Sequence, residues 1–478
     1  MLRLSSSLLL AGLAGSIAST QLLPAFSRIP VNVTGPTPTL AVPPPPTPDS
    51  LKLVYMGSSV PAGVGATNQH GYTALYSDLL AQRAAAGVGL PWKTANISIS
   101  GNNTLAVMKR FDADLLPQRA KYVVFALALG NEGIKEKGQP IFEQFKTNLV
   151  ALIERARAQG MVPIITNGYT RNDYGPEQYA FTRRMNLLIH GWNVPSINLL
   201  GAIDDGQGRW AAGYWYDALH PNDQGHAEMA YTIVPSLFDA LNAGKPLPTR
   251  RASKGILLTN TARHSAPTIQ LVPEDVVHSF TTAIRFKTAT AGQLIAIRDS
   301  AGLTTGTLQV APSGVITYTS AKGQHLTGKV PVVDNRWHQL ALTHYYARGA
   351  TLLYVDSTQE GNIAERLRPT RLTVGGPATP RRVQLRDWFF YRSGMNQDEI
   401  QAMAADSLLK SSLELYAPLA GHQTDSLTNL AQSLNKLTVI NTSQGKQKTS
   451  NSKRPIPQPT TRPKSPVGTP TPTSKRRK

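Results

Sequence analysis

The feature that most constrains this chain is a regular alternation of apolar runs and amphipathic stretches between residues 50 and 245. The apolar runs predict strands over residues 51–56, 94–99, 122–127, 162–166 and 196–199. Helical periodicity between them predicts helices over residues 72–86, 104–119, 142–159, 176–190 and 223–241. Strands that are apolar on both faces and alternate with helices require a parallel sheet covered on both sides. We therefore expect a three-layer α/β/α domain whose functional site lies at the carboxyl ends of its strands.

A serine follows the first predicted strand directly, in the segment Gly57-Ser58-Ser59-Val60-Pro61-Ala62-Gly63. A serine at a strand-to-helix turn presents its hydroxyl at the edge of the sheet, where neighbouring N–H groups also point outward. This makes Ser59 a candidate nucleophile. Taken alone, however, Ser59 is explained at least as well by a helix cap.

A second candidate group precedes the last predicted helix, where Asp217 and His220 lie three residues apart. This spacing allows the carboxylate to contact one imidazole nitrogen while the other nitrogen faces a serine hydroxyl. The pair has the composition of a general base and its orienting acid. A capping aspartate beside an unrelated histidine is the alternative.

Two further strand ends offer hydrogen-bond donors that could stabilise an oxyanion. Gly101 follows the second predicted strand, and glycine allows the backbone to approach a substrate closely. Asn131 follows the third strand and can donate a side-chain N–H. Each position is ordinary loop chemistry when considered separately.

The order Ser59, Gly101, Asn131 and His220 resembles the four sequence blocks of the SGNH (GDSL-like) hydrolases, over about residues 51–241. The resemblance implies that Ser59 is the nucleophile and that His220 and Asp217 complete a catalytic triad. It also implies an oxyanion hole formed by Ser59, Gly101 and Asn131.

The sequence departs from the family pattern at two places. Ser58 stands where the family usually has an aspartate before the nucleophile, and the usual Gly-x-Asn-Asp block reads Leu129-Gly130-Asn131-Glu132. The nucleophile and base are retained, whereas the groups that support them differ.

Aromatic residues lead into the predicted triad, and Tyr214 and Trp215 are the candidates for stacking on a sugar ring, with simple packing as the alternative. Asp204-Asp205-Gly206 is interpreted as a turn because it lacks the further spaced acids of a calcium loop. We expect no metal and no cofactor.

Beyond residue 255 the pattern changes to short strands separated by turn residues, which predicts an all-β jelly-roll sandwich over residues 255–420. The segments 335–343, 352–356 and 385–391 resemble laminin-G/concanavalin A-like modules. Trp337, which begins an alternating strand, is interpreted as a core residue. No ligand-binding residue is predicted in this domain.

The two ends of the chain differ in composition from both domains. Residues 1–20 have the early cation and apolar run of a secretory signal peptide, and residues 21–49 form a Pro-rich spacer. Residues 421–478 are predicted to be a Pro-rich, basic and disordered tail. Ten lysines and arginines after residue 441 supply half of the formal net charge of +20, so this charge does not indicate specific nucleic-acid binding.

These features together predict a secreted enzyme, periplasmic or at the cell surface, with no transmembrane segment. The absence of cysteine from the sequence excludes disulfides and thiolate chemistry. We expect a serine esterase that cleaves acyl esters, with O-acetyl groups on polysaccharide as the leading substrate class. The basic tail is a candidate site for anionic cell-wall polymer. A lipase or thioesterase of the same fold, or a non-catalytic carbohydrate-binding adhesion protein, is the alternative.

Overall fold

A computed structural model describes residues 48–420 and 427–441 of the chain. The predicted leader, nearly all of the Pro-rich spacer and the basic stretch from residue 442 lie outside the described residues. Among the described residues, no helix has the length and apolar character needed to cross a membrane.

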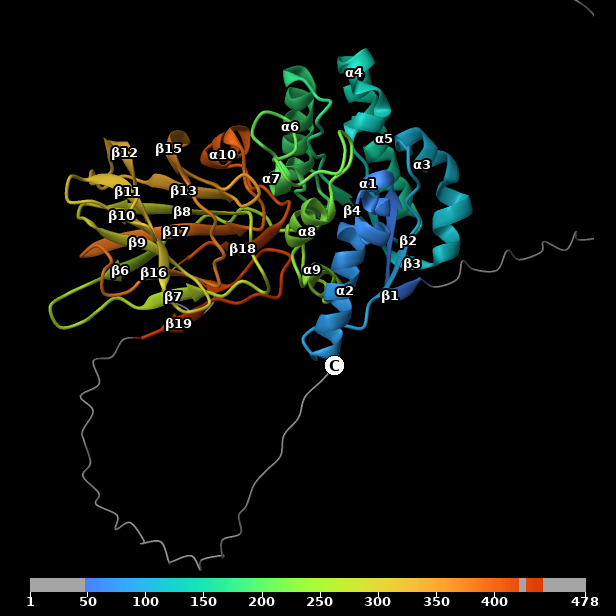
Figure 1. Ribbon diagram of the computed structural model, residues 1–478. Coiled ribbons are helices and arrows are strands. Elements are labelled where there is room, and N and C mark those ends of the chain that lie inside the picture. The colour runs from blue at the N-terminus through green and yellow to red at the C-terminus, as the bar shows by residue number, and fades with distance from the viewer. Residues whose placement is uncertain (1–47, 421–426, 442–478) are drawn as a thin grey trace, which may run out of the picture. The chain divides into compact units, whose positions relative to one another are not determined.

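A five-stranded parallel sheet forms the centre of the N-terminal region (Figure 1). Its strands are β1 (Asp49–Gly57), β2 (Lys93–Asn96), β3 (Ala120–Ala126), β4 (Val162–Thr166) and β5 (Ser196–Ile197). The strand order is β2-β1-β3-β4-β5, and every neighbouring pair is parallel. The strand that follows β1 in sequence, β2, lies beside β1 at one edge of the sheet, whereas the next strand, β3, lies on the opposite side of β1. The crevice between the carboxyl ends of β1 and β3 is therefore the place where an open parallel sheet of this order binds its ligand.

Helices cover both faces of this sheet, as the sequence predicted. One face packs against α2 (Tyr72–Ala85), α8 (Asp223–Tyr231) and α9 (Leu237–Asn242). The other packs against α3 (Thr104–Arg110), α5 (Gln139–Ala158) and α6 (Pro176–Gly191). Alternate residues of β1 contribute to the two apolar layers, so the strand is apolar from Leu53 to Met56. The three-layer α/β/α fold is confirmed.

Some element boundaries differ from the prediction. The helix expected over residues 223–241 is interrupted between α8 and α9, where Pro235 cannot donate a backbone hydrogen bond. The helix expected over residues 104–119 ends at Arg110, and irregular helical turns follow to Gln118. Three one-turn helices complete the region: α1 (Ser59–Ala62), α4 (Ile134–Lys137) and α7 (Leu200–Ile203).

The C-terminal region is a β-sandwich of two antiparallel sheets, which confirms the predicted all-β class (Figure 1). One sheet has the order β12-β11-β10-β9-β16-β7-β19 and the other the order β15-β14-β13-β8-β17-β18, with β6 also pairing with β17. The first sheet contains β7 (Thr268–Leu271), β9 (Gly292–Arg298), β10 (Thr304–Val310), β11 (Val315–Ser320), β12 (His325–Pro331), β16 (Arg371–Gly375) and β19 (Thr438–Ile440). The second contains β6 (Ile256–Thr259), β8 (Phe280–Thr288), β13 (His338–Tyr345), β14 (Ala350–Val355), β15 (Thr358–Ala364), β17 (Arg382–Tyr391) and β18 (Leu413–Ala417). Inward-facing residues of both sheets form one apolar core between them.

Two expectations for this region require correction. Residues 427–441 were assigned to the tail, but β19 extends a sheet by pairing with β7, and Ala431 is fully buried. The basic, Pro-rich composition begins only after these residues. Trp337 is half-buried rather than in the core, and the Arg386 guanidinium covers its ring, 4.3 Å from the ring centre.

The α/β region and the sandwich contact each other through a buried polar cluster. Helix α10 (Gln397–Ala404) carries Glu399, whose Oε1 accepts hydrogen bonds from three side chains of the α/β region. These donors are Asn186 at 3.0 Å, His190 at 2.8 Å and Asn198 at 2.7 Å. All four side chains are buried, so each region supplies hydrogen-bond partners that the other would otherwise lack.

Candidate active site

The turn between β1 and α1 holds Ser59 at the carboxyl edge of the sheet. Gly57 ends β1 so close to β3 that a Cβ there would lie 2.1 Å from the Ala126 carbonyl oxygen. Because Gly57 lacks this atom, the chain can turn sharply and begin α1 at Ser59. The backbone N–H of Ser59, as the first residue of the helix, has no partner within the helix and is available to a ligand.

The loop before α8 brings the predicted base to this serine. His220 Nε2 lies 3.0 Å from Ser59 Oγ, and His220 Nδ1 lies 2.9 Å from both carboxylate oxygens of Asp217. Asp217 Oδ1 also accepts the backbone N–H groups of Leu219 and His220, at 2.7 Å and 2.8 Å. These bonds fix the position of the carboxylate relative to the imidazole ring.

The environment of Asp217 favours its charged form. Desolvation by itself would raise the pKa of the carboxyl. The hydrogen bonds from the His220 ring and from the Leu219 and His220 amides outweigh it, so the pKa of Asp217 lies below its ordinary value. The carboxylate is therefore ionised at neutral pH. It faces His220 Nδ1, which must keep its proton while Nε2 accepts the proton of Ser59.

The predicted oxyanion donors Gly101 and Asn131 line the same cavity as Ser59 and His220, which has a volume of about 250 Å³. Gly101 adopts a φ of +79°, and its backbone N–H makes no hydrogen bond to any other described residue. Asn131 donates one side-chain N–H to the Asn102 carbonyl at 3.1 Å, which orients its amide beside this loop. The structure thus brings together Ser59, Gly101, Asn131 and His220.

Glu132, one of the departures from the family pattern, joins the two loops that carry the candidate oxyanion donors. Its carboxylate is buried and accepts hydrogen bonds from the backbone N–H and the hydroxyl of Thr104, at 2.6 Å and 2.9 Å. Burial raises the pKa of Glu132, although both bonds from Thr104 oppose this shift. Because Thr104 begins α3, the contact holds the Gly101 loop against the Asn131 loop.

Ser58, the other departure, is buried, and its hydroxyl interacts with the Tyr169 side chain and partly offsets the effect of burial on the tyrosine pKa. Burial raises the pKa of the Tyr169 hydroxyl to about 12, so it is protonated at neutral pH. A neutral hydroxyl pair therefore lies behind the nucleophile where the family usually has a carboxylate.

Sequence reasoning missed two residues of this cavity, Tyr169 and Arg171. Arg171 is buried, with two nitrogens 2.9 Å and 2.8 Å from the Asp173 carboxylate oxygens, and it lies so close to Gly130 that a Cβ there would clash with its guanidinium. Both residues follow β4. Because ligands bind at the carboxyl ends of parallel strands, their position directly after the fourth strand is the sequence signal that identifies them.

The aromatic residues before Asp217 have different environments. Trp210 is buried and stacks on Tyr169 at 5.6 Å, so it is a packing residue. Tyr214 is half-buried and Trp215 is exposed, and neither lines the cavity around Ser59. Asp204 and Asp205 accept backbone N–H groups of residues 206, 207 and 209, which is the hydrogen bonding of a turn.

The fold and these contacts are those of a serine ester hydrolase, because a serine, an imidazole and a carboxylate are joined in that order at the carboxyl edge of the sheet. Comparison with known proteins identifies the family. Residues 55–228 match the profile of the GDSL-like Lipase/Acylhydrolase family, so this part of the chain is a domain of that family and the protein is an ester hydrolase.

One curated relative and two solved structures are similar to this part of the chain. Esterase TesA from Pseudomonas aeruginosa is 29% identical over 187 residues, which cover 39% of this chain and 87% of the relative. Among solved structures, an acetylxylan esterase from Geobacillus stearothermophilus is 17% identical, with 38% of this chain and 92% of that chain covered and a TM-score of 0.32. An alpha/beta hydrolase enzyme from the metagenome of Lake Arreo is 21% identical, with coverage of 41% and 96% and a TM-score of 0.31.

Proposed function

We propose that this protein hydrolyses short acyl esters with Ser59 as the nucleophile, His220 as the general base and Asp217 as its orienting acid. The observation that carries the proposal is the unbroken hydrogen-bonded series from Ser59 Oγ through both ring nitrogens of His220 to the Asp217 carboxylate. Such a series lets the serine lose its proton while its oxygen forms a bond to carbon.

The reaction follows from this geometry. Ser59 Oγ attacks the ester carbonyl carbon as its proton passes to His220 Nε2, and the resulting oxyanion accepts N–H groups from Ser59, Gly101 and Asn131. The intermediate collapses, the C–O bond to the alcohol breaks, and the alcohol oxygen takes the proton from His220. Water then attacks the acyl-enzyme in the same way and releases the acid.

The size of the cavity supports a small acyl group. Its volume of about 250 Å³ falls below the range of roughly 300–1,000 Å³ typical of pockets that enclose drug-sized ligands. An acetyl group fits such a cavity, whereas a long acyl chain would extend into solvent. Exposed aromatic residues beside the triad, including Trp215, support a carbohydrate as the alcohol. The composition of residues 1–20 supports action after export.

A series of nitrophenyl esters of increasing acyl length tests this proposal. We expect kcat/KM to be highest for the acetyl ester and to fall by about tenfold or more by the octanoyl ester. A preference for octanoyl over acetyl would instead indicate a lipase or thioesterase. Release of acetate from acetylated polysaccharide, absent with Ser59→Ala, would support the carbohydrate assignment.

A further inference from the structure

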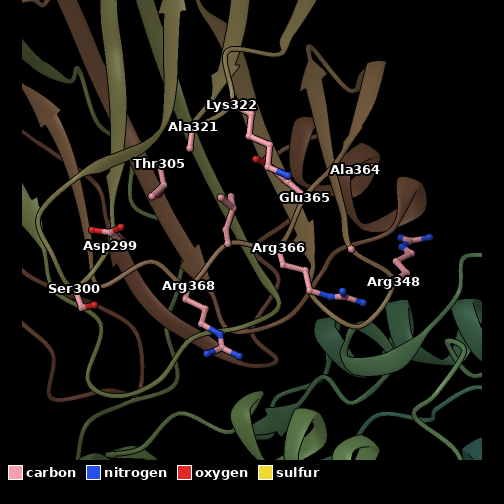
Figure 2. Close-up of a pocket in the computed structure, with 12 residues that line it drawn as sticks. Asp299, Ser300, Thr305, Ala321, Lys322, Arg348, Ala364, Glu365, Arg366 and Arg368 are labelled. Atoms are coloured by element: carbon pink, nitrogen blue, oxygen red, sulfur yellow. The ribbon is translucent and has the colours of Figure 1, made fainter.

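A second and larger cavity lies at one end of the β-sandwich, and its residues are separate from those around Ser59 (Figure 2). Its volume is about 780 Å³. The walls are formed by the segment after β9, the β11–β12 and β13–β14 turns, and the residues that follow β15. Four cationic side chains line it, together with two acids: Lys322, Arg348, Arg366 and Arg368, with Asp299 and Glu365.

The four cations of this cavity lack the close carboxylate partners that other arginines of the sandwich have, although Asp204 attracts Arg348 and Glu365 attracts Lys322 at longer range. Other arginines of the sandwich, such as Arg285 and Arg392, contact carboxylates at 2.5 Å and 2.7 Å. Among the described residues, none of the four cavity cations lies within ion-pair distance of an acid. The two acids have other partners, since Glu365 accepts the Tyr318 hydroxyl at 2.6 Å and Asp299 accepts the Leu303 amide at 2.9 Å.

Two guanidinium groups are held in place before any ligand binds. Arg366 donates to the carbonyl oxygens of Tyr346 and Ala347, at 3.1 Å and 3.3 Å, and Arg368 Nε donates to the Tyr346 hydroxyl at 2.9 Å. Tyr346 is itself buried and stacks on His278, with ring centres 3.8 Å apart. Both arginines remain exposed and retain N–H groups that these contacts do not use. Such preorganisation lowers the entropy lost when an anion is bound.

This cavity is linked to the loop that carries the triad. The Tyr214 side chain interacts electrostatically with the Arg366 guanidinium, and Tyr214 lies three residues before Asp217. Arg366 therefore lies beside the loop that positions the acid of the triad.

We propose that the cation-lined cavity binds an acidic glycan, a chain of sugar units bearing carboxylates, and presents its acylated units to Ser59. This inference rests on the proposed esterase function. The planar guanidinium forms paired hydrogen bonds with carboxylates, and the volume accommodates more than one sugar unit. A nucleic acid fits less well, because no aromatic ring is among the lining residues for bases to stack on.

The binding test uses the full chain carrying Ser59→Ala, so that its result does not depend on turnover. We expect trigalacturonate, titrated by calorimetry at low salt, to bind and to lose affinity about tenfold or more in the double variant Arg366→Gln/Arg368→Gln. The matched control Lys329→Gln/Arg381→Gln removes two exposed cations of the same sandwich that line no described cavity. Its affinity should stay within about twofold of the parent protein.

A kinetic test with intact Ser59 distinguishes the two proposals. In the double arginine variant, kcat/KM for an acetylated polyuronate should fall about tenfold relative to kcat/KM for acetylated xylan, which is neutral. Equal loss on both polymers, or unchanged trigalacturonate binding, would overturn the cavity assignment. Equally tight, arginine-dependent binding of a single-stranded oligonucleotide would also overturn it. Failure to hydrolyse any ester would contradict the esterase proposal alone.

Discussion

At the scale of single residues, the hydrogen bonds of the candidate site indicate a specific role for each side chain. His220 contacts a serine through one ring nitrogen and a carboxylate through the other, and Asp217 is fixed in turn by two backbone amides. Residue types and order along the chain were sufficient to predict this set. Arg171 and Tyr169 were not predicted, because neither residue type by itself indicates a catalytic site, and only their position after the fourth strand points to them.

Asp217→Asn tests the orienting acid while keeping its volume. The amide cannot stabilise the imidazolium and favours the wrong tautomer, so we expect kcat to fall by about 10³–10⁴-fold. Circular dichroism should show an unchanged fold. Stopped-flow or steady-state hydrolysis of nitrophenyl acetate measures the effect, and a loss below about tenfold would assign the role to another group.

Asn131→Ala tests the oxyanion donor. Loss of one donor to the tetrahedral intermediate should lower kcat by about 10²–10³-fold with little change in KM. Asn131 also donates a hydrogen bond to the Asn102 carbonyl, so the thermal unfolding temperatures of the variant and the parent protein are compared as a control. A variant that is equally stable and fully active would remove Asn131 from the mechanism.

At the scale of elements, the sequence predicted the type and order of the strands and helices well, because burial on both faces makes most of β3 and β4 and the second half of β1 apolar. It did not predict the irregular turns after Arg110 or the addition of β19 to the sandwich. Both depend on tertiary contacts. Strand β19 is short and exposed, so its own residues give no strand pattern, and it forms by pairing with β7, which is distant in the sequence.

Helix α8 carries a histidine whose protonation opposes folding. His226 is fully buried, accepts the Tyr72 amide through Nδ1 at 3.2 Å and contacts the Val64 carbonyl through Nε2 at 3.1 Å. Desolvation lowers the pKa of His226 from 6.5 to about 4. The unfolded chain therefore binds a proton that the folded chain does not, and the stability present above pH 6.5 is lost as the pH falls toward 4.

The expected contribution of His226 is about 3 kcal/mol between pH 7 and pH 4. Urea unfolding across this range should show a weaker pH dependence for His226→Gln than for the parent. Burial also lowers the pKa of His344, to about 3, and this residue contributes equally to both proteins. The exposed His264→Gln serves as the control and should match the parent, whereas a parallel decline for His226→Gln would contradict the assignment.

At the scale of the whole molecule, the α/β region and the sandwich depend on each other. The polar cluster around Glu399 buries hydrogen-bond donors from one region against an acceptor from the other. Composition gave no sign of this contact, since its members lie 201 to 213 residues apart in the sequence and are ordinary polar residues. Only the folded chain shows that the sandwich supplies the acceptor for these buried donors of the α/β region.

Glu399→Ala should destabilise the protein by about 3–5 kcal/mol, because it leaves three buried donors without an acceptor. The matched control is Asp398→Ala in the same helix, where a partly exposed contact with Arg183 at 3.3 Å should contribute no more than about 1 kcal/mol. Chemical denaturation followed by tryptophan fluorescence measures both. Equal stability of the two variants would mean that the cluster does not couple the regions.

Covalent labelling of the nucleophile tests the central claim most directly. A fluorophosphonate reacts with a serine that an adjacent base has activated, so incubation with the full chain followed by peptide mass spectrometry should place a single adduct on Ser59. Ser59→Ala should lose both the adduct and ester hydrolysis, while Ser58→Ala, which alters the adjacent buried serine, should still be labelled at Ser59. An adduct on another serine, or hydrolysis that persists in Ser59→Ala, would contradict the mechanism.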